Sequence, residues 1–182
     1  MHRLTHYQLC PHSRSIRLGL GELRLPTELV HEFPWAWRPS FLALNPSGAL
    51  PVLELEDGLV LCGSYAISEY LGDAYPQHPV DGGSGPMFPG DFEARAEVRR
   101  LVDWFHIKFD REATRELMLE KHYPRAVGGN GKPPDSAMLR AVAKNLKYHM
   151  DYICFLADHR NWLAGDELSF ADFAAGAHVS VL

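Results

Sequence analysis

A strand, an amphipathic helix and a second strand follow one another within residues 3–30, and this order restricts the fold more than any other feature of the chain. Residues 3–7 and 27–30 have the short apolar pattern of strands, and Ile16, Leu20 and Leu23 recur between them at helical spacing. Two strands joined by such a helix lie parallel in one sheet. The chain is therefore predicted to begin with a parallel βαβ unit.

The following residues predict two further strands, this time antiparallel. A short helix over residues 39–44 precedes a strand over residues 50–55. Asp57-Gly58 then supplies the positive φ of a tight hairpin leading into a strand over residues 59–62. A helix with Ile67 and Leu71 on one face follows. The order βαβ, helix, ββα predicts a thioredoxin-like α/β domain over residues 1–75.

The rest of the chain predicts a linker and an all-α domain. Residues 76–90 are rich in Pro, Gly, Asp and Ser, which is typical of a domain boundary. Residues 91–182 are predicted to form a helical domain, and their apolar end at Val181-Leu182 predicts that this domain is incomplete at its C-terminus. Two apolar stripes support the helices: Val98, Leu101, Val102, Phe105 and Phe109, and then Leu139, Val142, Leu146, Met150, Ile153 and Ala157.

Charge and hydropathy exclude several classes of protein. With 18 basic and 23 acidic residues the net charge is −5, which argues against nucleic-acid binding through phosphate neutralisation. No stretch approaches the roughly 18 apolar residues of a membrane span, and the residues after Met1 lack the pattern of a signal peptide. The sequence predicts a cytoplasmic protein with no membrane insertion.

The three cysteines predict free thiols and no metal site, because Cys10, Cys62 and Cys154 are odd in number and far apart. Cys62 and Cys154 lie in apolar runs and are predicted to be core residues. Cys10 directly precedes a helix, whose N-terminus would favour the thiolate. Because Ser13 stands where a dithiol oxidoreductase has its second cysteine, Cys10 would act alone.

Pro51 and Ser64 each allow two interpretations from the residues alone. Pro51 begins a central strand, so the Leu50-Pro51 bond is either cis or an ordinary trans bond at a strand entrance. Ser64 precedes a helix and either helps its N-terminus to hold a carboxylate or simply caps the helix. Further along, Asp172 is predicted to reach back to Ser169 in a capping box.

Two further groups suggest a surface for a partner. Trp35 and Trp37 lie in a connecting segment, where they form either an exposed apolar patch or part of the core. Arg111 and Arg115 are four residues apart and share a helix face. Their charges either keep this face in contact with water or bind a partner protein.

Four motifs together resemble the glutathione S-transferase superfamily: residues 10–13, residues 45–53, residues 64–71, and residues 163–166 leading to 169–172. The resemblance implies the glutathione S-transferase fold, a cis Pro51 and a homodimer. It also implies that Cys10 faces the glutathione sulfur, that the Leu50 backbone pairs with the cysteinyl part and that Ser64 receives the γ-glutamyl carboxylate. Gly63 departs from the pattern, since many members have an acidic residue there.

A closer resemblance is to a family of alphaproteobacterial division proteins built on the same fold. It is carried by residues 95–105, 128–136, 145–150 and 162–166. It implies a non-enzymatic protein without a cofactor that binds filaments of the tubulin-like GTPase FtsZ at the division site, favours their curvature and promotes constriction. The residues expected to contact FtsZ are Trp35, Trp37, Arg111 and Arg115. The alternative is a glutathione-dependent transferase or thiol transferase that uses Cys10.

Overall fold

The computed structural model describes residues 1–76, 85–128 and 133–182. Four strands form one mixed sheet in the order β2-β1-β3-β4. Strand β1 pairs parallel with β2 and antiparallel with β3, which pairs antiparallel with β4. The predicted βαβ unit and antiparallel pair are therefore confirmed. The strands are β1 (His2–His6), β2 (Thr27–His31), β3 (Val52–Glu54) and β4 (Val60–Cys62).

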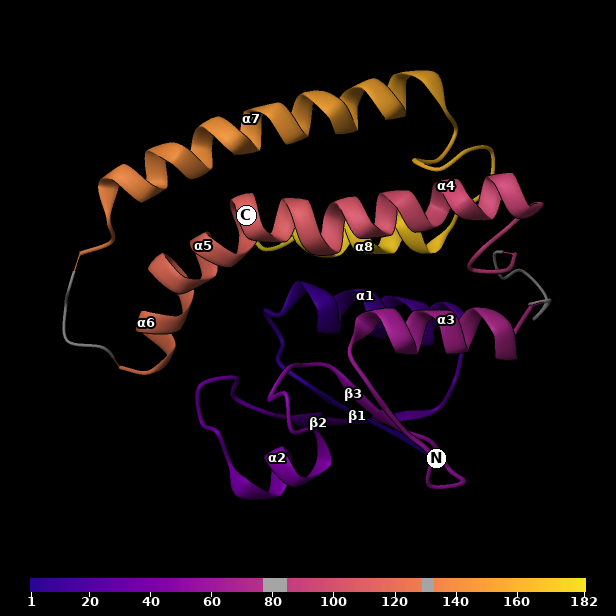
Figure 1. Cartoon of the computed structure of the whole chain (residues 1–182), viewed down its shortest axis with the longest axis horizontal. Helices are drawn as coiled ribbons and strands as arrows, with labels where there is room; N and C mark the ends of the chain where they lie inside the picture. Colours follow the sequence, from indigo (N-terminus) through magenta and orange to yellow (C-terminus); the bar gives the residue numbers. More distant parts are fainter. Residues whose placement is uncertain (77–84, 129–132) are drawn as a thin grey trace.

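Helices cover both faces of this sheet. Helices α1 (Pro11–Glu22) and α3 (Ser64–Ala74) lie on one face, and α2 (Pro39–Leu44) lies on the other (Figure 1). A proline begins both α1 and α2, where its fixed φ suits the first helical turn and its missing N–H costs no hydrogen bond. The first half of the chain thus has the predicted thioredoxin-like architecture.

The Leu50-Pro51 peptide bond is cis, as the family resemblance implied. The carbonyl of Pro51 accepts a hydrogen bond from the Gly63 N–H at 2.9 Å. Gly63 has a φ of +87°, a left-handed conformation that glycine adopts without strain. The entrance to β3 is in this way fixed to the start of α3.

The second half of the chain is helical. Helix α4 begins where the Asp91 side chain accepts hydrogen bonds from the backbone of Glu93 and Ala94 at 3.1 and 3.0 Å. It runs directly into a π-helix, in which hydrogen bonds span five residues, and the chain then bends through short segments (Figure 1). The elements are α4 (Phe92–Asp103), η1 (Trp104–Thr114), α5 (Arg115–Leu117), η2 (Met118–His122), α6 (Tyr123–Ala126), α7 (Ser136–His159) and α8 (Phe170–Val179).

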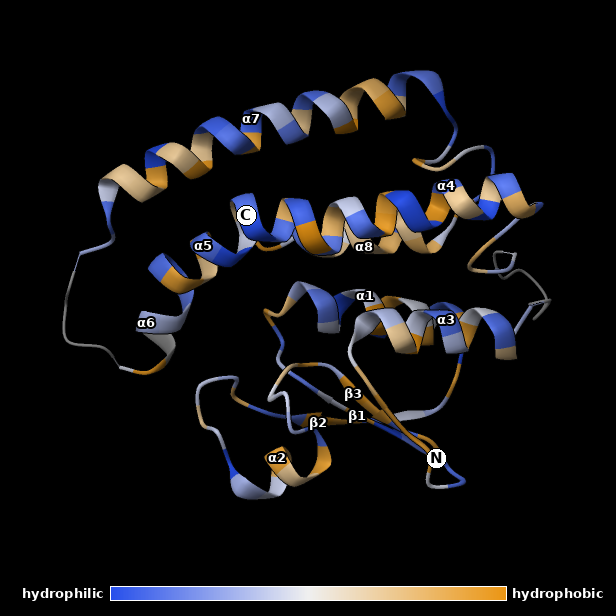
Figure 2. Cartoon of the chain, viewed as in Figure 1, coloured by the Kyte–Doolittle hydropathy of each residue, from blue (hydrophilic) through white to orange (hydrophobic). Residues whose placement is uncertain are grey.

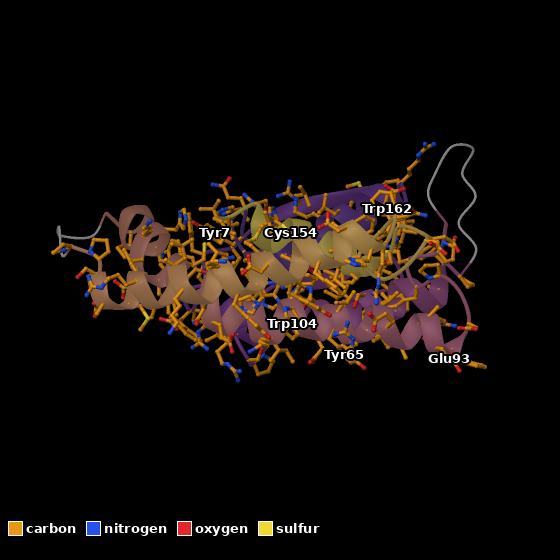
Figure 3. The ribbon with its side chains drawn as sticks, turned by 90° about the horizontal axis from the view of Figure 1, so that it is seen from above. Tyr7, Tyr65, Glu93, Trp104, Cys154 and Trp162 are labelled. Carbon is orange, nitrogen blue, oxygen red and sulfur yellow. The ribbon has the colours of Figure 1, made fainter. Side chains whose placement is uncertain are left out.

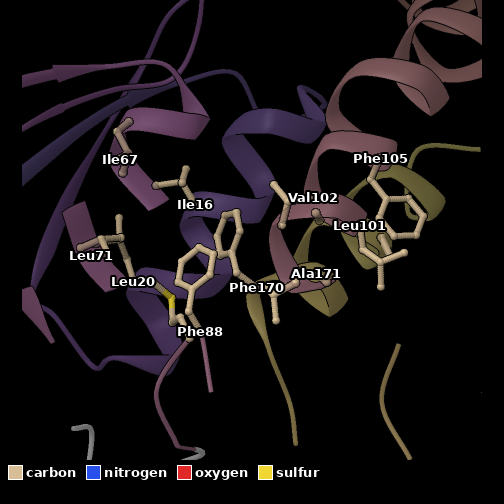
Figure 4. Packing of buried hydrophobic residues seen from close by; sticks show 14 of the residues in the cluster. Ile16, Leu20, Ile67, Leu71, Phe88, Leu101, Val102, Phe105, Phe170 and Ala171 are labelled. Carbon is tan, nitrogen blue, oxygen red and sulfur yellow. The ribbon is translucent and has the colours of Figure 1, made fainter. Parts of the chain in front are cut away.

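One apolar core joins the two halves (Figure 4). Helix α1 packs closely on α8, and a Cβ added to Gly19 of α1 would lie 3.1 Å from the Met87 Sδ. The core residues include Ile16, Leu20, Ile67 and Leu71 from the first half, and Val98, Leu101, Phe105 and Phe170 from the second. Because these side chains form a single cluster, the two halves stabilise each other.

The apolar stripe predicted along α7 is confirmed in part, whereas the prediction that Cys62 and Cys154 lie in the core was wrong. Val142 is buried and Leu146 and Ile153 pack against the core, but Ala157 is exposed. The helix rests on η1 along one narrow side, and hydrophobic and hydrophilic residues alternate along it (Figure 2). Cys154, on the outer helix α7 (Figure 3), is exposed, and so is Cys62, because β4 is the edge strand of the sheet.

Of the predicted linker, residues 77–84 lie outside the described residues, while 85–90 form no helix or strand. Within the part of the chain that the structure describes, no helix has both the length and the apolar character to cross a membrane.

Candidate functional site

Cys10 lies at the N-terminus of α1, as the sequence indicated. It occupies the position just before the first helical residue, and its backbone N–H donates to the Tyr7 carbonyl at 3.0 Å. Its own carbonyl accepts the Arg14 N–H at 2.9 Å, which begins the helix. Strand β1 and helix α1 therefore fix the position of the thiol.

The surroundings of Cys10 are apolar, which changes the expected chemistry of its thiol. Burial raises the pKa of Cys10, and hydrogen bonds from Ser13 offset this only in part. Burial therefore disfavours the thiolate that the helix N-terminus was expected to favour. The apolar cluster around it contains Tyr7, Phe41, Leu50, Val52, Met118 and Val181, with Trp35 and Tyr123 partly buried beside them.

A small cavity of about 200 Å³ opens beside Cys10. Met118 and Tyr123 from the helical half line it together with Pro11 and Arg115. Tyr123 packs against Tyr7, with 5.9 Å between ring centroids, and burial raises the pKa of its phenol, which keeps the group neutral. The helical half thus narrows the space in front of the cysteine.

Ser64 is buried, at 8% exposure, and does not cap its helix. Its Oγ instead lies 3.1 Å from the Nδ1 of His12, and it lines a separate cavity of about 130 Å³ with His106. The capping interpretation was wrong. Leu50 belongs to the same apolar cluster as Cys10, and the neighbouring Pro51 is buried. Ser64 is connected to the Cys10 cavity through His12.

The expected partner-binding residues differ in their surroundings. Trp35 is half-buried against Tyr123, which lines the Cys10 cavity together with Arg115. Trp37 is 61% exposed, and the Arg111 side chain is 67% exposed with its Nη2 3.6 Å from Glu112. Each interpretation of the tryptophans therefore holds for one residue, burial in part for Trp35 and exposure for Trp37.

Three histidines that spacing along the chain did not indicate also meet at this site. His12, His106 and His178 come from α1, η1 and α8, and one nitrogen of each lies within 4.8 Å of the others. Burial lowers the pKa of His106 well below its ordinary value and that of His178 to about 3. No sequence signal was available, because the three positions are far apart and share no motif.

Known proteins resemble this chain along nearly its whole length. Residues 4–79 match the family of the glutathione S-transferase N-terminal domain. The FtsZ-localized protein A of Caulobacter vibrioides is 41% identical, over 98% of this chain and 76% of that protein. The solved structure of FzlA from C. crescentus is 42% identical with a TM-score of 0.90, covering 99% of this chain and 77% of that one. A glutathione S-transferase structure from Rhodospirillum rubrum is 44% identical with a TM-score of 0.90, covering 100% of this chain and 78% of that one.

Proposed function

The chain belongs to the glutathione S-transferase superfamily and, within it, to the family of FtsZ-localized protein A; from this membership we propose that it is a cell-division protein. It binds FtsZ filaments in the cytoplasm at the division site, favours their curvature and supports constriction. The observation that carries the proposal is the 41% identity to FtsZ-localized protein A along 98% of this chain. The aligned part includes the helical half as well as the sheet half, so the likeness extends beyond the shared fold of the first domain.

The features of the Cys10 cavity favour a protein-binding function over an enzymatic one. Its volume of about 200 Å³ is below the roughly 300 Å³ at which small-molecule sites usually begin. The raised pKa of Cys10 leaves little thiolate for nucleophilic attack. In addition, the Ser64 hydroxyl is already engaged by His12. We therefore propose that filament binding needs no glutathione and no other cofactor.

The contact with FtsZ is proposed to involve the exposed Trp37, the exposed Arg111, Trp35, which packs against Tyr123, and Arg115, which lines the Cys10 cavity. Arginine and tryptophan are enriched among the residues that dominate protein interfaces, and FtsZ is an acidic partner. The protein is further proposed to act as a homodimer, because two equivalent sites raise avidity for a filament without new contacts.

The decisive experiment is co-sedimentation of the full-length protein with GTP-assembled FtsZ from the same organism, followed by electron microscopy of the pellet. We expect co-pelleting and curved filaments. The double variant Arg111→Glu/Arg115→Glu should pellet less, whereas Arg140→Glu, an exposed residue of α7, should behave as the wild type. A protein that stays in the supernatant at micromolar concentration would contradict the proposal.

The competing function is a glutathione-dependent transferase that uses Cys10, and the 44% identity to the R. rubrum transferase structure favours it. The variant Cys10→Ala distinguishes the two. The division function predicts unchanged co-sedimentation and no saturable glutathione binding by calorimetry. The transferase predicts saturable glutathione binding in the wild type and loss of turnover in Cys10→Ala.

A further inference from the structure

His12, His106 and His178 each have one ring nitrogen within 4.8 Å of the corresponding nitrogens of the other two. The Nδ1 of His106 lies 3.1 Å from the Nε2 of His178, and the ring of His12 stacks on that of His106 at 4.6 Å between centroids. The Nε2 of His12 lies 3.7 Å from the Oδ1 of Asp110. Three imidazoles and one carboxylate from three separate helices therefore surround the same point.

The other nitrogen of each ring contacts a hydroxyl group. The Nδ1 of His12 faces the Oγ of Ser64 at 3.1 Å, the Nε2 of His106 faces the Oγ of Ser15 at 3.2 Å, and the Nδ1 of His178 faces the Oγ1 of Thr114 at 2.8 Å. Histidines that bind metals nearly always donate their second N–H to an oxygen, which orients the ring. All three rings have such a partner.

The hydrogen bonds from Thr114 and Ser15 define where the protons can lie. The Thr114 hydroxyl donates to Asp110 at 3.0 Å, so its oxygen accepts the Nδ1–H of His178 and leaves the His178 Nε2 lone pair free. The Ser15 hydroxyl has one hydrogen and two acceptors, the His12 carbonyl at 2.9 Å and the Nε2 of His106.

These two positions of the Ser15 hydrogen correspond to two states of the cluster. If Ser15 donates to His106, then His106 carries its proton on Nδ1 and donates it to His178. If Ser15 donates to the His12 carbonyl, then His106 carries its proton on Nε2, and two lone pairs face each other across 3.1 Å. In the second state both lone pairs are available to a cation, and no proton has to leave the protein to reach it.

We propose that His12, His106 and His178 form a binding site for a divalent transition-metal ion of the zinc type, with the Asp110 carboxylate beside it. Two nitrogens bound to one tetrahedral zinc ion at about 2.0–2.1 Å lie about 3.3 Å apart, close to the separation between His106 and His178. His12 has to turn inward to complete the site. Its side chain, 26% exposed, is the one with room to do so.

Two cavities border parts of the cluster. His12 and Asp110 line the cavity of Cys10, and His106 lines the cavity of Ser64. The site uses no cysteine and is independent of the proposed binding to FtsZ. It departs from the sequence-based expectation of no metal site, which considered only residues close to the cysteines.

The test is titration of untagged, chelator-treated full-length protein with Co²⁺, whose visible absorption reports tetrahedral coordination, followed by competition with Zn²⁺. We expect one Co²⁺ per chain, displaced by Zn²⁺. The variant His12→Gln should weaken binding by at least about tenfold. His159→Gln is the matched control, because His159 is exposed and its ring contacts the carbonyl and the ring of Phe155, on its own helix; metal binding by this variant should equal that of the wild type.

Absence of saturable binding in the wild type, equal affinity in His12→Gln, or an equal loss in His159→Gln would overturn the site. Circular dichroism checks that His12→Gln is folded. If it is not, X-ray absorption of the zinc-loaded wild type decides, since two or three imidazoles around the ion support the site and one or none refutes it. Each of these outcomes leaves co-sedimentation with FtsZ unaffected.

Discussion

The ring of Trp35, from the segment that leads into α2, packs against the ring of Tyr123 in α6 with 5.1 Å between their centroids. The contact joins the two halves of the chain beside Cys10, because Tyr123 also lines the cysteine cavity. Tyr123 is thus one of the side chains that limit the access of reagents to the thiol.

Alkylation should reveal this arrangement. We expect iodoacetamide at neutral pH to modify the exposed Cys154 well before Cys10, because burial raises the pKa of Cys10 and Tyr123 narrows its cavity. Tyr123→Ala should accelerate modification of Cys10 and leave the rate at Cys154 unchanged, as measured by mass spectrometry of timed samples. Equal rates at the two cysteines in the wild type would show that the thiol is accessible.

Two glycine substitutions should change stability in opposite directions. A Cβ on Gly72 of α3 would lie 2.6 Å from the Phe88 ring, so Gly72→Ala should lower the free energy of unfolding by about 1–3 kcal/mol. Gly21 of α1 is exposed and has nothing within 4 Å of an added Cβ, so Gly21→Ala should raise it by about 0.5–1 kcal/mol. Urea denaturation measures both, and a neutral Gly72→Ala would mean that Phe88 moves aside freely.

The ion pairs of Glu97 predict a dependence of stability on pH. Hydrogen bonds from Arg100 and Arg160 lower the pKa of Glu97 from 4.5 to about 2. Because the folded pKa lies below the unfolded one, the stabilisation is present above pH 4.5 and is lost as the pH falls towards 2.

Glu97→Gln should therefore destabilise the protein by about 1–2 kcal/mol at pH 7, a value discounted for the partial solvation of the group. The difference from the wild type should shrink below pH 4.5. Glu28→Gln, which removes an exposed pair with Arg3, serves as the control and should cost less than about 0.5 kcal/mol. Denaturation curves from pH 7 to 3 test this, and a difference independent of pH would refute the role of the charge.

Asp172 is expected to contribute more to stability than an ordinary surface acid. Its carboxylate accepts the Ser169 N–H at 2.9 Å, the Ser169 hydroxyl at 3.0 Å and the Leu163 N–H at 2.9 Å. Asp172→Ala should lower the melting temperature and should lower the free energy of unfolding by about 2 kcal/mol, because buried donors lose their acceptor. Asp166→Ala, which removes one long contact to Asn161, should change little. Equal effects of the two substitutions would argue against the capping box.

Local signals predicted the elements of the fold correctly. The capping box at Ser169 and the helices that begin at Pro11 and Pro39 depend on neighbouring residues alone, so they are visible in the sequence. The family resemblance added the cis bond at Pro51.

Properties that depend on distant parts of the chain were not predictable. Cys62 lies in an apolar run, but its exposure follows from the position of β4 at the edge of the sheet. The raised pKa of Cys10 depends on side chains from the helical half that pack around it. The meeting of His12, His106 and His178 depends on the packing of α1 against η1 and α8.

The apolar cluster shared by the two halves has a consequence for the evolution and unfolding of the chain. Separation of the halves would expose Ile16 and Leu20 on one side and Phe170 on the other, so neither half would retain a finished interior. Heating should therefore give one cooperative transition, with equal calorimetric and van't Hoff enthalpies. By the same reasoning, a sheet half exchanged alone between relatives would need a matching α8.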